Sequence, residues 1–332
     1  MIGVLPGTKP EWKDQSVLLT AHYDHLGRGW PDVHEGDEGL VHPGADDNAS
    51  GVAVLLELAR SLAAAGSPHR TIVFVAFSGE EAGLLGSRHY AEHPALPLGQ
   101  AMGVVNLDTV GRLGDGEVSV LASGTASEWP HIFRGASYVT GVESRMIPDS
   151  LDSSDQASFI GRGVPAVQIF TDAHADYHRP GDTAERVDGR GLVRVATFVK
   201  EGVAYLAERE EPLTRTMAAT ETTGEAAAAS RSRGGPAAGA GGGSGRRVSF
   251  GTVPDFGFAG PGVKVAGLVA GSPAERAGVK EGDVLLRFAD HELPNLRSYS
   301  DVLKGLEPGQ EVRVVVRRGD EELTLEATLA ER

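Results

Sequence analysis

The chain has 332 residues, of which 40% are hydrophobic and 23% charged, and its formal net charge is −15. Its length exceeds one ordinary core and predicts two domains. The acidic balance disfavours nucleic acid and anionic membrane surfaces as partners, and no apolar run approaches the length of a membrane span. Because there is no Cys, any metal site must use His, Asp and Glu.

Residues 1–211 alternate short apolar runs with helical patterns. A helix is predicted where apolar residues recur at helical spacing from Val52 to Leu62, with Asn48 and Ser50 as cap candidates. Another is predicted from Leu192 to about Glu208. This alternation predicts an α/β domain with a mostly parallel mixed sheet sandwiched by helices. The predicted strands are Val17–Ala21, Thr71–Phe77, Met102–Leu107, Val118–Leu121 and Val164–Phe170.

Residues 212–247 interrupt this pattern. The stretch from Thr214 to Arg247 consists largely of Ala, Gly, Ser, Thr and Arg without apolar periodicity, which predicts a flexible linker. Strand-like runs return over residues 248–332, so we expect a second, small β-rich domain there. At the other end, Met1 leads directly into a strand-like run. We therefore expect the chain to lack part of its natural N-terminus.

Five short segments of the first domain carry residues suited to metal chemistry. His22 and Asp24 follow the first long strand, Glu80 and Glu81 the second, and Asp108 ends the third. The five segments are Ala21–His25, Gly44–Gly51, Ser78–Gly83, Asn106–Thr109 and Asp176–Pro180. In an open α/β sheet, ligands gather at the carboxyl ends of the strands. Imidazole and carboxylate donors without thiolate favour a catalytic zinc site.

These segments, in this order, resemble the di-zinc aminopeptidase family, which includes bacterial leucyl aminopeptidases and, more distantly, glutamate carboxypeptidases and glutaminyl cyclases. The resemblance covers nearly all of residues 2–208. It extends to Ser154-Asp155-Gln156 and to Gly163-Val164-Pro165-Ala166, a weaker signature. The usual leading helix of the family is absent. Because the motifs match in order, the zinc exopeptidase fold of the family is the expected fold of this domain.

The resemblance implies a role for each matching residue. His22 and Asp108 would hold one zinc, Glu81 and His178 a second, and Asp47 would bridge the two ions. Glu80 would be the general base. Two further residues would assist, Asp24 by orienting His22 through a hydrogen bond and Tyr177 by polarising the scissile carbonyl.

The other histidines are expected to be structural or surface residues. They are His25, His34, His42, His69, His89, His93, His131, His174 and His291. His174 is the least certain of them, since it lies close to His178. The 28–43 loop carries further His and acidic residues, and we expect it to be a solvated loop.

The second domain resembles a PDZ domain of the bacterial HtrA type. The resemblance rests on Gly271–Val279 and the following Gly282-Asp283, where Ser272 is placed to cap a short helix and Gly278 to end it. Such domains bind an extended peptide end by strand addition. Phe256-Gly257-Phe258 is the predicted loop for a terminal carboxylate. A domain retained only as a spacer is the alternative.

The predicted function is that of a zinc-dependent aminopeptidase with two Zn²⁺ per chain, acting on peptides. A glutaminyl cyclase or a carboxypeptidase on the same scaffold is an alternative. The cyclase is less favoured because Glu80–Ser87 matches the short aminopeptidase version of that segment. A non-enzymatic peptide-binding scaffold is the alternative from a different class. The family resemblance implies secretion or a periplasmic location, although no signal peptide precedes Ile2.

Overall fold

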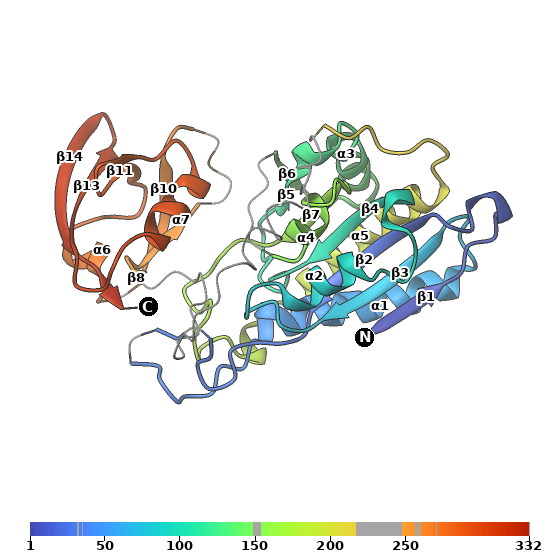
Figure 1. The fold of residues 1–332 in the computed structure, drawn as a ribbon, viewed down its shortest axis with the longest axis horizontal. Coiled ribbons are helices and arrows are strands. Elements are labelled where there is room, and N and C mark those ends of the chain that lie inside the picture. Colours follow the sequence, from blue (N-terminus) through green and yellow to red (C-terminus); the bar gives the residue numbers. More distant parts are fainter. Residues whose placement is uncertain are drawn as a thin grey trace, which may run out of the picture.

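The computed structural model describes residues 1–31, 33–34, 36–148, 154–216, 248–255, 258, 260–269 and 271–331. Residues 1–216 form an α/β domain, and residues 248–331 contain a smaller β-rich domain (Figure 1). The strands and helices of the first domain are β1 (Ile2–Leu5), β2 (Ser16–His22), α1 (Gly51–Ala65), β3 (Thr71–Phe77), α2 (Leu85–Glu92), β4 (Ala101–Leu107), β5 (Val118–Leu121), α3 (Trp129–Thr140), β6 (Ser144–Ile147), α4 (Gln156–Ile160), β7 (Ala166–Phe170) and α5 (Gly189–Glu208).

One mixed sheet of seven strands organises this domain, in the order β1-β3-β2-β4-β7-β5-β6. The four central strands β3, β2, β4 and β7 run parallel, because β2 pairs in parallel with both β3 and β4, and β4 with β7. Strand β1 pairs antiparallel with β3, and β5 antiparallel with β7. The predicted fold class, a mostly parallel mixed sheet between helices, is confirmed.

Helices cover both faces of the sheet. On one face α1, α3 and α5 bury apolar side chains in a core that includes Leu58, Trp129 and Phe198. On the other face α2 and α4 contribute Tyr90 and Phe159 to a second cluster. Because the central strands are buried on both faces, they consist mainly of apolar residues, as expected for parallel strands.

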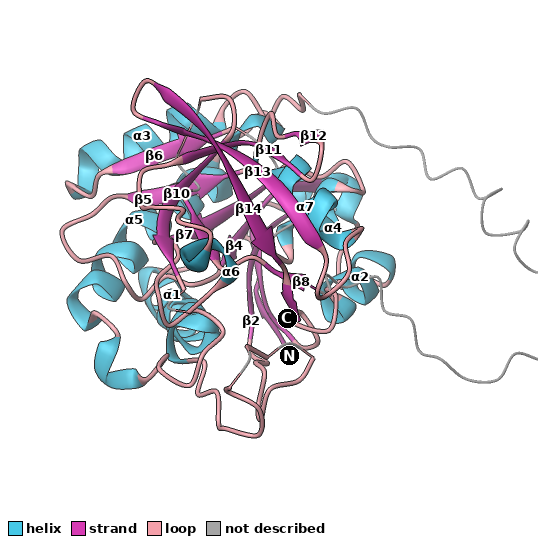
Figure 2. Cartoon of the chain, turned by 90° about the vertical axis from the view of Figure 1, so that its left-hand side faces the viewer, coloured by secondary structure: helices cyan, strands magenta, loops and turns pink. Residues whose placement is uncertain are grey.

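The second domain contains a five-membered path of strands in the order β14-β13-β11-β10-β9, with β12 beside β11. Its apolar core includes Phe250, Phe288 and Leu303. Figure 2 views the molecule from the side of this domain, with the β13–β14 hairpin in front. The elements are β8 (Val248–Ser249), β9 (Thr252–Pro254), β10 (Val263–Leu268), α6 (Pro273–Arg276), β11 (Val284–Phe288), β12 (His291–Glu292), α7 (Leu296–Lys304), β13 (Glu311–Arg318), β14 (Glu321–Thr328) and β15 (Ala330–Glu331).

The predicted caps of the short helix α6 are present. The Ser272 side chain accepts a hydrogen bond from the Glu275 backbone N–H at 3.2 Å, Pro273 is the first helical residue, and Gly278 has a φ of +86°. Most of the predicted linker, from residue 217 to residue 247, lies outside the described residues.

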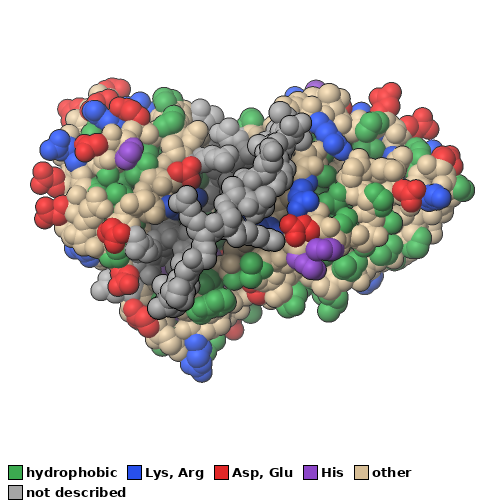
Figure 3. Space-filling model, viewed as in Figure 1, with side chains coloured by type: hydrophobic (Ala, Val, Ile, Leu, Met, Phe, Trp, Pro, Cys, Tyr) green, Lys and Arg blue, Asp and Glu red, His purple; other side chains and the backbone are tan. Residues whose placement is uncertain are grey.

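Neither the charge distribution on the surface nor the helices of the described residues point to nucleic acid or a membrane as a partner. On the face drawn in Figure 3, acidic and basic side chains are interspersed over both domains, and the described residues form no basic patch there. No helix among the described residues is long and apolar enough to cross a membrane.

Candidate metal centre

The carboxyl ends of the four central parallel strands carry the predicted site. His22 is the last residue of β2, and Asp108 directly follows β4. Glu80 and Glu81 lie in the turn after β3, and His178 lies in the loop after β7. Because these strands are neighbours and point the same way, their ends bring the side chains together at one edge of the sheet.

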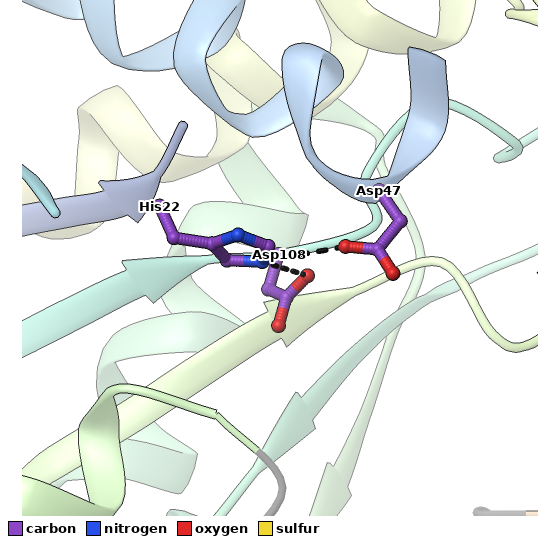
Figure 4. A group of neighbouring side chains, drawn as sticks. All are labelled: His22, Asp47 and Asp108. Carbon is purple, nitrogen blue, oxygen red and sulfur yellow. Dashed lines mark hydrogen bonds and ion pairs between the residues drawn. The ribbon is translucent and has the colours of Figure 1, made fainter. Parts of the chain in front are cut away.

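His22, Asp47 and Asp108 form a first buried cluster (Figure 4). The Nε2 atom of His22 lies 3.3 Å from Asp47 Oδ1 and 3.4 Å from Asp108 Oδ1. The ligand atoms of the three side chains lie within 4.8 Å of one another, close enough to surround one ion.

A second cluster shares Asp47 with the first. The Nε2 atom of His178 lies 3.2 Å from Asp47 Oδ2 and 3.4 Å from Glu81 Oε2. The two oxygens of Asp47 therefore face different histidines, Oδ1 toward His22 and Oδ2 toward His178. This is the arrangement that a carboxylate bridging two cations requires.

The donor set fits a pair of zinc ions. Donors that share one tetrahedral zinc at about 2.0–2.2 Å lie roughly 3.3–3.6 Å apart, close to the separations in both clusters. Burial by itself disfavours the ionised form of the carboxylates, and Asp47 is only 2% exposed. Bound cations would compensate that excess of buried negative charge. The residues present therefore suit two divalent ions with imidazole and carboxylate ligands.

The charges of the site shift the pKa values of the cluster residues. Burial raises the pKa of Asp47, but hydrogen bonds to His178 and His22 outweigh it and hold this pKa well below its usual range. Burial lowers the pKa of His22, but the negative charges and hydrogen bonds of Asp108 and Asp47 raise it by more. The pKa of His22 therefore lies well above its usual value. Asp47 is thus held as a carboxylate.

Two further residues fix the backbone around Asp47. The Asp182 carboxylate accepts hydrogen bonds from the Asp46 and Asp47 backbone N–H groups at 2.9 and 3.0 Å. The Asn48 side chain accepts from the Gly51 backbone N–H at 3.0 Å at the start of α1, but the N-cap position itself, Ser50, makes no side-chain cap bond. The Ser50 hydroxyl bonds Asp46 instead of capping the helix. Asp182 was not among the predicted residues, although it follows His178 by only four positions.

Asp24 contacts His22 differently from the predicted arrangement. The Nδ1 atom of His22 lies 3.1 Å from the backbone carbonyl oxygen of Asp24, whereas the Asp24 carboxylate is 3.8 Å away. The carboxylate instead accepts from the Glu80 backbone N–H at 3.3 Å. Asp24 can therefore fix the His22 ring through its main chain and the Glu80 turn through its side chain.

Two groups of side chains lie close enough to hold a metal ion: His22, Asp47 and Asp108, and His25, Asp47 and Glu81. Glu80 belongs to neither of these metal-holding groups. Burial raises its pKa well above the usual value; His22 opposes the shift, and Asp108, Glu81 and Asp155 add to it. Burial also raises the pKa of Asp155 to about 6. A carboxylate with a raised pKa at the edge of a metal cluster is suited to proton transfer.

Tyr177 and His174 border the site. The Tyr177 ring stacks on His178 with ring centroids 4.0 Å apart and is 38% exposed, so its hydroxyl can reach a bound molecule. His174 has its Nε2 atom 3.1 Å from Asp46 Oδ2, beside the Asp46–Asp182 network. His174 therefore contacts the residue next to Asp47 and belongs to neither group of potential metal ligands.

The structure differs from the sequence expectation at His25, which was expected to lie outside the site. Its Nδ1 atom is 2.8 Å from Glu81 Oε1, and His25, Asp47 and Glu81 form the second potential metal-holding group. A lone histidine three residues after a ligand carries no sequence signal of the direction its ring takes.

One cavity of about 290 Å³ extends from this centre to the second domain. On one side it is lined by Asp108, Tyr177 and His178. On the other it is lined by β9 and by one side of α7, including Tyr299 and Leu303. In the described part of the chain β9 ends its sheet and has a strand on one side only. A free strand edge beside a helix is the geometry for peptide addition.

The predicted carboxylate loop falls only partly on described residues. Phe256 and Gly257 lie outside them. Phe258 is described but is not among the residues that line the cavity, whereas Ser249, which ends β8, and Gly251, which precedes β9, do line it. The residues 249–251 are thus the nearer candidates for a peptide end.

Comparison with known proteins identifies both parts of the chain. The model of peptidase family M28 matches residues 1–203, and the model of the PDZ domain matches residues 242–329. The predicted resemblances to a zinc aminopeptidase family and to a PDZ domain are confirmed.

Individual relatives agree with the family match. The chain is 31% identical over 212 residues to "Aminopeptidase YwaD" of Bacillus subtilis, an alignment that covers 60% of this chain and 43% of the relative. A solved structure of a zinc aminopeptidase from Bacillus subtilis is 29% identical, with a TM-score of 0.54, covering 63% of this chain and 50% of that one. A glutaminyl cyclase structure from Porphyromonas gingivalis, 23% identical with a TM-score of 0.52 and covering 61% of this chain and 75% of that one, shares the fold. The chain thus spans less than half the length of the aminopeptidase relative it matches.

Proposed function

Because the chain belongs to peptidase family M28, we propose that residues 1–211 are a zinc-dependent exopeptidase domain that removes N-terminal residues from peptides. The observation that carries the proposal is the division of the Asp47 oxygens between His22 and His178. The names of the relatives support zinc and aminopeptidase chemistry. Residues 212–247 would be a linker and residues 248–332 a PDZ domain.

The proposed ligands follow from the two clusters. His22 and Asp108 would hold one zinc ion, Glu81 and His178 the other, with Asp47 between them. When bound, zinc supplies Lewis acidity that polarises a carbonyl and makes water more acidic. Each proposed ligand atom lies within 3.4 Å of another, as a shared coordination sphere requires.

The other residues would move or hold protons and position the substrate. Glu80 would take a proton from the attacking water and deliver it to the leaving amine, as its raised pKa allows. The Tyr177 hydroxyl would donate a hydrogen bond to the oxygen that develops at the scissile carbonyl. The backbone carbonyl oxygen of Asp24 would hold the His22 ring in its orientation.

The reaction can be tested with a panel of peptides on zinc-loaded protein. We expect release of the N-terminal residue from free peptides and aminoacyl-arylamides, and no reaction with N-acetylated peptides. Cyclisation of a peptide that begins with Gln, without hydrolysis of the others, would instead establish a glutaminyl cyclase. Release of C-terminal residues would establish a carboxypeptidase. No reaction with any of them by protein that binds zinc would leave the peptide-binding scaffold as the function.

For the second domain we propose binding of a peptide or protein C-terminus. Strand addition to β9 would seat the peptide between that strand and α7, with its carboxylate at the backbone N–H groups of residues 249–251. The apolar side chains of Val253 and Leu296 in the cavity lining, both partly exposed, support an apolar peptide side chain there. Titration with peptides that differ only in a free or an amidated C-terminus tests this, since amidation should abolish binding.

We also propose a secreted or periplasmic location, supported by the resemblance to secreted bacterial aminopeptidases. Fractionation of cells that produce the full natural protein tests it. Recovery of the protein in the cytoplasmic fraction alone would contradict the proposal.

A further inference from the structure

His25 occupies a fixed place beside the second cluster. Its side chain is 9% exposed, and its ring meets the His178 ring edge-on with centroids 5.9 Å apart. Gly44 lies against the other side of the ring with a φ of +62°, and a Cβ built there would lie 2.5 Å from His25 Cγ. Only glycine at position 44 therefore leaves room for this ring position.

The two oxygens of Glu81 face different groups. Oε2 lies 3.4 Å from His178 Nε2, a separation that suits two ligands of one ion, whereas Oε1 lies 2.8 Å from His25 Nδ1, the length of a hydrogen bond. His25 Nδ1 is also 3.9 Å from Asp47 Oδ2, too far for a hydrogen bond. The geometry thus separates the ligand oxygen of Glu81 from the oxygen that His25 contacts.

From this division we infer that His25 is a positioning residue for the second metal ion. Its Nδ1–H donates a hydrogen bond to Glu81 Oε1 and turns Oε2 toward the ion. The inference rests on the proposed two-metal site and adds to it a residue that is not a ligand. A carboxylate ligand held by such a partner keeps its orientation before the metal arrives, which increases affinity.

The other ring nitrogen agrees with this role. His25 Nε2 is buried and has no hydrogen-bond partner among the described residues. A neutral ring that donates from Nδ1 needs no donor proton at Nε2, so the tautomer required by Glu81 leaves Nε2 as an acceptor. In this role His25 acts on the metal through Glu81.

The test compares two replacements of similar size. His25→Asn retains an amide N–H close to the position of Nδ1, whereas His25→Leu fills the same space without a donor. Zinc affinity is measured by competition with a chelator for the wild type, both variants and His89→Ala, a control on the exposed side of α2. Thermal melting of the metal-free proteins establishes that each variant is folded.

We expect both the wild type and His89→Ala to bind two ions per chain. Each ion should bind to the two proteins with the same affinity. His25→Leu should weaken one of the two ions by about 10–100-fold, typical for loss of a residue that orients a metal ligand, and leave the other unchanged. His25→Asn should recover most of that loss. Equal affinities of wild type and His25→Leu would overturn the inference.

Two other outcomes are also decisive. If both variants lose the second ion and the visible spectrum of the cobalt-loaded protein changes in both, His25 is itself a ligand and the positioning role is wrong. If the wild type binds fewer than two ions, the proposed two-metal site fails before His25 is considered. The stoichiometry of the wild type therefore separates failure of the proposed function from failure of this inference.

Discussion

Replacement of Glu80 by Gln tests the division of labour between the adjacent glutamates. Glu80 lies outside both metal-holding groups, and Glu81 lies inside the second. Gln has the size of Glu and leaves unchanged the backbone N–H of residue 80, which donates to Asp24. The substitution should therefore remove a proton acceptor and nothing else from the site.

The expected magnitude follows from that single loss. Removal of a general base typically costs about 10²–10⁴-fold in rate. At about 1.36 kcal/mol for each factor of ten, this corresponds to about 2.7–5.4 kcal/mol of transition-state stabilisation. We expect kcat of Glu80→Gln to fall by at least about 10²-fold, with the zinc content unchanged.

Glu81→Gln is the matched control. Because Glu81 Oε2 lies 3.4 Å from His178 Nε2, this variant should lose affinity for one ion as well as activity. The assay combines initial rates on an aminoacyl-arylamide with elemental analysis of dialysed protein. If Glu80→Gln lost zinc while Glu81→Gln retained both ions, the assignment within the pair would be reversed.

Four further expectations concern metal content, pH and the second domain. By elemental analysis, the metal-saturated protein should contain close to two ions per chain, and its Asp108→Ala variant should contain close to one. One ion in both proteins would indicate a mononuclear site. In the metal-free protein, burial raises the pKa of Glu80, so its carboxyl should take up a proton well above pH 4.3. An NMR titration of the metal-free protein should show a carboxyl that titrates there and disappears in Glu80→Gln; identical titrations of the two proteins would contradict this. Burial raises the pKa of Asp283, but hydrogen bonds donated by Arg318 Nε and Nη2 help to outweigh it and hold this pKa below its usual value. The resulting stabilisation is present above about pH 3.9 and is lost as pH falls through the lower folded pKa. Asp283→Asn should therefore cost about 1–3 kcal/mol at pH 7 in calorimetric unfolding, and no loss relative to an Asp301→Asn control would refute this. A chain ending at Glu211 should hydrolyse a small arylamide about as well as the full chain. Its efficiency should fall, through a higher KM, only on longer peptides. A truncated protein that is folded and zinc-loaded but inactive would mean that the PDZ domain completes the active site.

The positions of the proposed ligands were predictable because they coincide with strand ends. His22, Asp108 and the Glu80–Glu81 pair each follow an apolar run that forms a central strand. Parallel neighbours must end at the same edge, so the sequence predicts proximity without any knowledge of side-chain rotamers. The turn before α1 was also predictable as part of the site, but the choice of Asp47 over Asp46 came from the family resemblance.

The supporting contacts were not predictable in the same way. The position of the His25 ring depends on Gly44 at a φ of +62°, which is set by the path of the loop. Asp24 meets His22 through its carbonyl because the chain turns after β2, and a residue type does not specify which of its oxygens is used. Asp182 reaches back across more than 130 residues to the Asp47 backbone.

The second domain shows the same limit. The capped helix α6 was predictable because Ser272, Pro273 and Gly278 act on their own neighbours. The proposed peptide groove depends on which edge strand lies beside α7. Among the described residues that strand is β9, which pairs with β10 on one side only. Phe256-Gly257-Phe258 remains a prediction for the carboxylate loop.

The two-metal centre at Asp47 can be tested most directly by crystallography of the zinc-loaded protein. Anomalous difference maps at the zinc absorption edge should show two peaks, about 3.5–4 Å apart, on opposite sides of the Asp47 carboxylate. One peak should lie beside His22 and Asp108, and the other beside Glu81 and His178. A single peak, or a pair in which Asp47 contacts only one ion, would contradict the two-metal account.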